Sequence, residues 1–205
     1  MATKKRAGRR LARGVLLALA MFLTSPLWIL DRLESALGGE AWFNFCSELL
    51  SLCPGAPGVH LRRGFYRMSL EAFGGGGESV SIGFGTTLSH REIRIGRRVY
   101  IGHRCTIGRA VIADDAVLGS NVDVLSGGRQ HNCDDLDRPI QEQGGSFRQV
   151  RIGANSWIGN SAVVMNDVGD QCIIGAGSVV VHPIPDRTVA VGNPAVVKKH
   201  RAPAR

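Results

Sequence analysis

Apolar residues recur at intervals of six through the second half of the chain. The series are Ile95, Ile101, Ile107, Ile112, Leu118 and Val124, and then Ile152, Ile158, Val164, Val168, Ile174 and Val180. The interval is shorter by one residue between Ile107 and Ile112, and shorter by two between Val164 and Val168. A period of six fits neither a helix of 3.6 residues per turn nor a simple alternating strand. The pattern predicts a flat-sided coil that turns a corner after each short strand.

Small side chains accompany the leading aliphatic residues. Most leading residues are followed directly by one, namely Gly96, Gly102, Gly108, Ala113, Gly119, Gly153, Gly159 and Gly175. Another small or β-branched residue stands four positions after the leading one, as in Cys105, Ala116, Val122, Ser156, Ala162 and Ser178. We expect the leading residue to point inward and the small residue to allow a tight corner. One coil cannot bury its apolar side alone, so the coils are predicted to stack into a solenoid.

The repeat is interrupted once, over residues 127–150. This stretch is polar, rich in glycine and too long for one side of a coil. We expect a loop that projects from the coil edge, where loops often carry function. It contains His131, Cys133 and several charged residues.

Residues 1–73 lack the period and are predicted to be helical, with the glycine run 74–77 as the boundary. The apolar run 14–30 has 17 residues and no charge, and Pro26 is expected to break its helix. Ala41–Leu52 and Leu61–Phe73 are predicted as further short helices on either side of the Pro- and Gly-rich stretch 53–58. Residues 74–197 form the predicted solenoid domain, and residues 198–205 a basic tail.

Positive charge lies on both sides of the apolar run. Residues 1–13 carry six basic residues and no acid, and Arg62, Arg63 and Arg67 follow the run. We therefore predict that residues 1–73 associate with the cytoplasmic face of the inner or plasma membrane, lying on it or re-entering it, with these arginines able to contact anionic headgroups. The alternatives are a signal peptide cleaved after residues 18–20, a span that exports the solenoid, and a helix packed on the body or on a partner subunit.

Composition narrows the class of protein. The chain has 205 residues, 44% of them apolar, which suits one domain with an appendage and excludes a disordered chain. The net charge of +8 comes from the two ends, because residues 14–197 carry 15 basic and 17 acidic residues. We expect no nucleic-acid partner for so neutral a body. Five cysteines without CxxC spacing predict neither a disulfide framework nor a metal site.

Two longer motifs accompany the repeats. The first consists of Asn155–Gly159 followed later in the chain by Ile174–Val180. The second is Val191–Ala195, with the sequence VGNPA. Over residues 80–199 the chain resembles the hexapeptide-repeat acyltransferases, in the branch that O-acetylates sugars and surface polysaccharides. The resemblance implies a left-handed parallel β-helix, acetyl-CoA as the cosubstrate, and a homotrimer with active sites between subunits.

The resemblance implies that His131 is the general base, since it matches the family's loop histidine. An alcohol attacks a thioester only as its proton is removed, and imidazole suits that task at neutral pH. Cys133 is a rival nucleophile. Asp134 and Asp135 are candidates to orient the imidazole or bind the acceptor, or are merely solvated. Arg129 is a candidate to bind a phosphate or uronate.

The resemblance also places acetyl-CoA in a groove between the C-terminal coils. The implied contacts are Asn160 and Ala176, their neighbours Gly159 and Ser178, and Lys198 and Lys199 for the nucleotide phosphates. Val181-His182 and Val196 depart from the usual residues of the family, which weakens the implied phosphate contacts. His103 either lines the acceptor pocket or lies on the surface, and Trp157 either flanks the cleft or packs outside the coil.

The sequence thus predicts an acetyltransferase for a sugar hydroxyl of a lipid-linked or surface-polysaccharide precursor. One alternative is a small soluble acceptor, such as serine or an amino or nucleotide sugar. Another is a trimeric scaffold without catalysis, and a longer acyl chain also stays open. Carbonic anhydrases with the same coil hold zinc through three histidines, two of them close together in one loop, but the next histidine after His131 is His182, so this ligand pattern is missing here.

Overall fold

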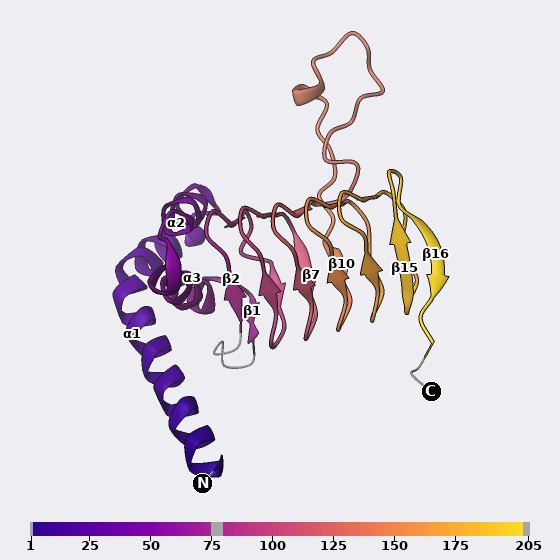
Figure 1. Ribbon diagram of the computed structural model, residues 1–205. Coiled ribbons are helices and arrows are strands. Elements are labelled where there is room, and N and C mark those ends of the chain that lie inside the picture. The colour runs from indigo at the N-terminus through magenta and orange to yellow at the C-terminus, as the bar shows by residue number, and fades with distance from the viewer. Residues whose placement is uncertain (1, 75–79, 203–205) are drawn as a thin grey trace.

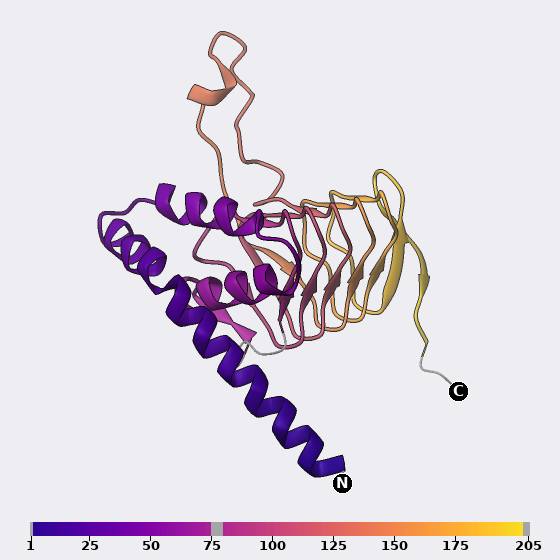
Figure 2. The same cartoon turned by 60° about the vertical axis from the view of Figure 1, so that its left-hand side comes forward.

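The computed structural model describes residues 2–74 and 80–202, so most of the glycine run 74–77 lies outside the described residues. Three helices come first, and a stack of short strands follows them (Figures 1 and 2). The helices are α1 (Ala2–Ala36), α2 (Ala41–Ser51) and α3 (Gly55–Ser69). They gather at one end of the stack, and the C-terminus lies at the other.

The strands form three sheets, which are the three faces of a solenoid. Sheet A contains β1 (Ala72–Phe73), β4 (Arg94–Ile95), β7 (Ala110–Ile112) and β10 (Val150–Ile152). Sheet B contains β2 (Ser81–Ile82), β5 (Tyr100–Ile101), β8 (Val117–Leu118), β11 (Trp157–Ile158), β13 (Ile173–Ile174), β15 (Thr188–Val191) and β16 (Val196–His200). Sheet C contains β3 (Thr87–Leu88), β6 (Thr106–Ile107), β9 (Asp123–Val124), β12 (Val163–Val164) and β14 (Val179–Val180).

Successive coils pair in parallel, residue above residue. In sheet B, for example, Ile101 lies beside Leu118, which lies beside Ile158. The leading aliphatic residues point inward and are at most 5% exposed. The small residues two positions before them, such as Ala116 and Ser156, are buried as well. The predicted fold class, a mainly β parallel solenoid with an N-terminal helical region, is confirmed. Its first strand, β1, lies just before the expected boundary at residue 74.

Two of the three corners of each coil have a fixed length. From Ile82 onward, six residues separate the leading residue of sheet A from that of sheet B, and that of B from that of C. The third residue after a leading one is left-handed in these corners, with φ between 52° and 74°. These residues are Gly85, Arg98, Arg104, Asp115, Asn121, Asn155, Ser161, Gln171, Gly177 and Arg187. The shortened intervals at Ile112 and Val168 both fall at the third corner, from sheet C to sheet A.

The glycines that follow the leading residues have a different role from the expected one. Gly153 and Gly159 lie outside the left-handed region, so they do not make the tight corner. They are needed because adjacent coils touch there. A Cβ atom on Gly153 would lie 2.3 Å from the backbone of Gly169 in the next coil, and one on Gly159 would lie 2.5 Å from the nitrogen of Ala176.

Helices α2 and α3 cover the first coil, which would otherwise expose the end of the core. Phe43, Phe65 and Tyr66 are fully buried there, with ring centroids 5.6–6.3 Å apart. The Ser47 hydroxyl pairs with the Tyr66 hydroxyl at 2.8 Å and accepts the backbone N–H of Leu88 in β3 at 2.9 Å. Burial raises the pKa of Tyr66 to about 12, so the phenol stays neutral.

Two of the arginines expected to face a membrane fasten this cap. Arg62 is fully buried, and its guanidinium donates to the carbonyls of Ile82 at 3.0 Å and Leu50 at 2.8 Å. Arg63 donates to a backbone carbonyl of the first coil at 2.7 Å. Of the three, Arg67 alone is exposed. The prediction was wrong for Arg62, whose buried guanidinium is held by carbonyls from distant segments, and it stays a prediction for the half-buried Arg63 and for Arg67.

The expected break at Pro26 does not occur, since α1 is continuous from Ala2 to Ala36. Proline lacks the N–H that would bond the carbonyl four residues earlier. The Ser25 hydroxyl donates to that carbonyl, of Phe22, at 2.8 Å. The third helix also differs from its prediction, because α3 begins at Gly55 and ends at Ser69. Pro57 stands in its first turn, where a missing N–H costs little.

We expect Gly153→Ala to destabilise the solenoid by about 1–3 kcal/mol, because the new methyl group forces two coils apart. Gly14→Ala is the matched control, since nothing lies within 4 Å of a Cβ there and alanine favours the helix. Thermal unfolding followed by circular dichroism measures both. A Gly153→Ala protein as stable as the control would show that coil contact does not select glycine.

Candidate active site

The long loop leaves the solenoid at the corner between sheets C and A, and Figure 1 shows it projecting away from the coils. Its two limbs are held together by backbone hydrogen bonds. Arg148 donates to Ser126 at 2.9 Å, Ser146 to Arg129 at 2.8 Å, and Asn132 to Gly144 at 2.9 Å. The loop therefore has a paired stem that carries its tip away from the coils.

One glutamine organises the tip, which contains a short 3-10 helix, η2 (Ile140–Glu142). The side-chain oxygen of Gln143 accepts the backbone N–H of Asp135 at 3.1 Å. Its amide nitrogen donates to the carbonyls of Asp135 at 2.7 Å and Arg138 at 2.8 Å. Three hydrogen bonds from one side chain thus fix the turn opposite His131.

His131 is exposed where the stem meets the tip. It borders a hollow of about 530 Å³ with Pro139, Ile140 and Gln141. Among the side chains that the structure describes, which exclude those of residues 1–7 and 9–11, none is hydrogen-bonded to its imidazole. Asp135 accepts instead from the backbone N–H of Asp137 at 3.0 Å, as part of the loop's own fold. An open imidazole beside a hollow is free to meet an incoming hydroxyl group.

The other loop residues singled out from the sequence are exposed. They are Arg129, Cys133 and Asp134, and none is fixed against the ring of His131. All five cysteines are free thiols. Burial raises the pKa of Cys46 to about 11, and that of Cys105 also rises, so these two are poor nucleophiles.

The residues assigned to the cosubstrate lie at another corner, between sheets B and C. Asn160 and Ala176 occupy the same place in successive coils, and both are exposed. The Asn160 side-chain oxygen accepts the N–H of Ser120 at 3.1 Å, which joins two coils. Gly159 has no room for a side chain. The corner is therefore a narrow column of small residues, along which a thin flexible chain could lie against the backbone.

Ser178 does not belong to that surface. It is fully buried, and its hydroxyl accepts the backbone N–H of Gly192 at 3.1 Å. Lys198 and Lys199 are exposed but belong to β16, not to a loose tail. Val189 of β15 lies beside Lys199 in an antiparallel pair. Both ammonium groups are thus carried on a defined strand at the end of sheet B.

His103 lies in the same corner column as Asn160, two coils nearer the helices, and its side chain is exposed. Trp157 stands on the outer face of sheet B and is 53% exposed, so it packs outside the coil. His131 is on the corner between sheets C and A, and the small-residue column is on the corner between B and C. A single chain therefore does not bring the imidazole and the column together.

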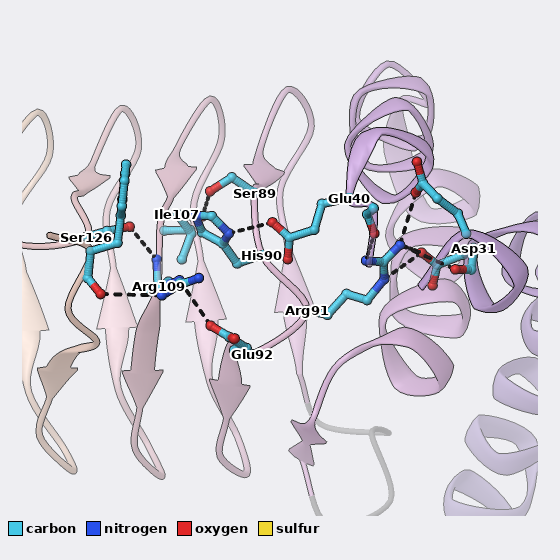
Figure 3. Close-up of polar contacts among 12 residues, drawn as sticks. Asp31, Glu40, Ser89, His90, Arg91, Glu92, Ile107, Arg109 and Ser126 are labelled. Atoms are coloured by element: carbon cyan, nitrogen blue, oxygen red, sulfur yellow. Dashed lines mark hydrogen bonds and ion pairs between the residues drawn. The ribbon is translucent and has the colours of Figure 1, made fainter. Parts of the chain in front are cut away.

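A histidine–carboxylate pair that sequence reasoning missed lies near the foot of the loop (Figure 3). His90 Nδ1 is 2.8 Å from Glu40 Oε2, and the His90 ring meets the edge of Phe147 with centroids 6.4 Å apart. Arg109 stacks over Phe147 at 6.0 Å and pairs with Glu92 at 3.0 Å. His90 and Glu40 are 50 residues apart, so no local spacing signals them. The pair ties the start of α2 to the first coil.

Both halves of the repeat match a model of a known protein family. A family model for the hexapeptide repeat of succinyl-transferase matches residues 92–126 and 149–182, the segments on either side of the loop. A probable acetyltransferase of Mycobacterium tuberculosis is 33% identical over 54% of this chain and 45% of that protein. A galactoside O-acetyltransferase of Lactococcus lactis is 31% identical over 60% of this chain and 54% of that protein. The chain spans about half the length of the curated relatives it matches.

Among solved structures, a maltose O-acetyltransferase from Clostridium difficile is similar, with a TM-score of 0.68. The match covers 80% of this chain and 87% of that one, at 24% sequence identity. At that identity the likeness shows the fold, and it extends the agreement beyond the two segments matched by the family model.

We expect Gln143→Ala to loosen the loop tip without destabilising the coils. Chymotrypsin should then cleave after the exposed Leu136 about fivefold faster or more, which corresponds to ~1 kcal/mol of lost local stability, because Leu136 lies between the two residues whose carbonyls Gln143 holds. The melting temperature should stay unchanged, because the tip is exposed. Gln141→Ala is the control, a neighbouring exposed glutamine. Equal cleavage rates in the two variants would contradict the fastening role of Gln143.

Proposed function

The chain belongs to the hexapeptide-repeat acetyltransferase family, and from this premise we propose that it moves an acetyl group from acetyl-CoA to a sugar hydroxyl. The observation that carries the proposal is an open imidazole, His131, on an ordered loop of a hexapeptide solenoid. The matched galactoside O-acetyltransferase supports a sugar as the acceptor.

In the proposed reaction His131 is the general base. The imidazole takes the proton of the acceptor hydroxyl as its oxygen bonds to the thioester carbonyl carbon. The carbon–sulfur bond then breaks, and the proton held by His131 passes to the departing thiolate. Such proton transfer contributes about 10²–10⁴-fold to the rate. The exposed Cys133 has no role in this scheme, because direct transfer needs no acyl-enzyme.

Acetyl-CoA supplies the activated acetyl group, and the corner column fits its long thin arm. Gly159 brings the backbone of two coils together, and Asn160 and Ala176 are exposed beside it. Lys198 and Lys199 lie on β16, and their ammonium groups provide positive charge for the nucleotide phosphates of acetyl-CoA. Ser178 is left out of this assignment, because its hydroxyl is buried and already bonded.

The active unit we propose is a homotrimer whose sites lie between subunits. The outer face of sheet B carries an apolar ladder in which Tyr100, Val117, Trp157, Ile173 and Val189 lie side by side. Tyr100, Val117 and Trp157 are 39–53% exposed in the single chain. We propose that a second copy buries this ladder, and that the loop of one chain then lies against the corner column of its neighbour.

The acceptor we favour is a sugar on a lipid-linked or surface-polysaccharide precursor at the cytoplasmic face of a membrane. Its support is the apolar N-terminal helix, since acetyl-CoA is cytosolic and such an acceptor is held at a membrane. A small soluble acceptor is the competing assignment. Acetylation of free serine or nucleotide sugars, with none of lipid-linked sugars, would replace our proposal by that one.

We expect His131→Ala to lower kcat by about 10²–10⁴-fold, because the general base is lost. Binding of acetyl-CoA, measured by calorimetry, should change by no more than about twofold, since His131 is not in the corner column. Cys133→Ser is the matched control in the same loop and should keep full activity. Acetyl transfer that survives His131→Ala but not Cys133→Ser would contradict the mechanism.

Two inactive variants should complement each other if the sites are shared. Ala176→Trp blocks the corner column, and His131→Ala removes the base. Mixed assemblies of the two, isolated through different affinity tags, should recover about a third of wild-type activity, because every mixed trimer has one interface of three with both an intact base and an open column. Mixed assemblies that remain inactive would place the base and the cosubstrate in one chain.

A further inference from the structure

Helix α1 has one face on the body and an opposite face that is apolar and uncovered. Leu17, Ala20 and Thr24 are buried against the body. On the other side the exposed apolar residues are Val15, Leu19, Phe22, Ile29 and Leu33, which are 51–74% exposed. Ala12–Ala36 is long and apolar enough to cross a membrane by length and composition, but only 22% of its most apolar window is buried. We call the exposed set the outer face of α1.

A groove between α1 and α3 continues the outer face. Its volume is about 460 Å³, and its lining includes Leu16, Leu19 and Leu23 from α1 with Pro57, His60 and Leu61 from α3. The His60 Nδ1 atom is buried without a hydrogen-bond partner. Burial and the nearby Arg63 lower the pKa of His60, so the ring is neutral at neutral pH. An uncharged imidazole leaves the groove suited to apolar ligands.

The second half of α1 is fixed to the soluble body. Asp31 is fully buried and accepts two hydrogen bonds from Arg91 of the first coil, at 2.6 and 2.8 Å (Figure 3). The Trp28 indole donates to a carbonyl in the last turn of α3 at 3.0 Å. At Gly64 of α3 the two helices touch, because a Cβ atom there would lie 2.6 Å from Ala20.

These contacts argue against a helix that crosses a bilayer. Crossing with residues 12–36 would carry the Asp31–Arg91 pair, and with it the first coil, into the hydrocarbon. Charged groups at that depth are costly. A helix that lies in the interface needs no such rearrangement, because its buried face stays on α3 while its outer face meets lipid.

The charges near both ends of α1 indicate which kind of surface its outer face binds. The first thirteen residues carry six basic residues and no acid, whereas residues 14–30 carry no charge. Arg32 and Arg67 are exposed near the other end of the helix. Each lysine or arginine close to an anionic membrane contributes about 1 kcal/mol of attraction. A partner protein with a neutral surface would not be attracted by basic residues at both ends of the helix.

We propose that the outer face of α1 binds in the plane of an anionic lipid bilayer, with both ends of the helix on the side of the solenoid. The proposal goes beyond the proposed function, because it concerns a surface that the catalytic groups do not share. Figures 1 and 2 show the N-terminal turns of α1 extending beyond the other elements.

The first experiment measures co-sedimentation of the full chain with empty vesicles that contain no acceptor. We expect binding to vesicles of phosphatidylcholine with about one third phosphatidylglycerol, and much less to phosphatidylcholine alone. Salt at about 1 M should weaken binding, because it screens the charges. The double variant Leu19→Glu with Phe22→Glu should bind at least about tenfold more weakly. Leu136→Glu, at an exposed apolar residue of the loop tip, is the control and should bind like the wild type.

A second measurement separates lying on the bilayer from crossing it. A protease site placed before residue 1 should be cut completely on closed vesicles when protease is added outside. Protection of a substantial fraction would overturn the in-plane orientation. Equal vesicle binding by the wild type and the double variant would show that the outer face of α1 is not the membrane-binding surface.

A second copy of the chain is the competing occupant of this face. Sedimentation of the wild type and the double variant without lipid tests it. If both have the same assembly mass and melting temperature, the loss of vesicle binding belongs to the membrane surface. A variant that is smaller than the wild type and binds vesicles equally would assign the face to self-association instead.

Discussion

The backbone hydrogen bonds between coils are the constraint from which the rest of the molecule follows. They hold adjacent coils so close that Gly153 and Gly159 admit no side chain. From Ile82 onward, two corners of each coil keep one length, so variation in length there is confined to the third corner. The His131 loop leaves from that corner, while the small-residue column runs along another. The separation of the proposed base from the proposed cosubstrate site within one chain is therefore a property of the coil.

Helices α2 and α3 cover the end of the apolar core, and they are held there by polar groups as well as by aromatic rings. Arg62 is buried without a carboxylate partner and depends on backbone carbonyls from α2 and the first coil. Asp31 and Arg91 provide a second buried tie, from α1 to the same coil. Breaking one partner of such a contact leaves an unsatisfied buried group, which costs more than the bond contributes. The cap and the solenoid should therefore unfold together.

The sequence predicted what depends on repetition and missed what depends on distant contacts. The period of six located the inner columns, the loop and even the corner where the length varies, because each coil repeats the same environment. Pro26 was expected to break α1, but the Ser25 hydroxyl satisfies the carbonyl that proline leaves open. Ser178 fits a cofactor contact by size, yet its side chain faces inward to Gly192. The His90–Glu40 pair joins residues far apart in sequence, so no local pattern could reveal it.

The last strand has a bearing on solubility that is independent of catalysis. Helices cover one end of the solenoid, but the other end finishes on β16, which pairs with β15 in the antiparallel sense. A parallel coil that ended bare would offer its strand edges to another molecule and invite end-to-end polymerisation. Reversing the chain direction and placing Lys198 and Lys199 on the terminal strand opposes such growth, since charged edge strands repel further pairing.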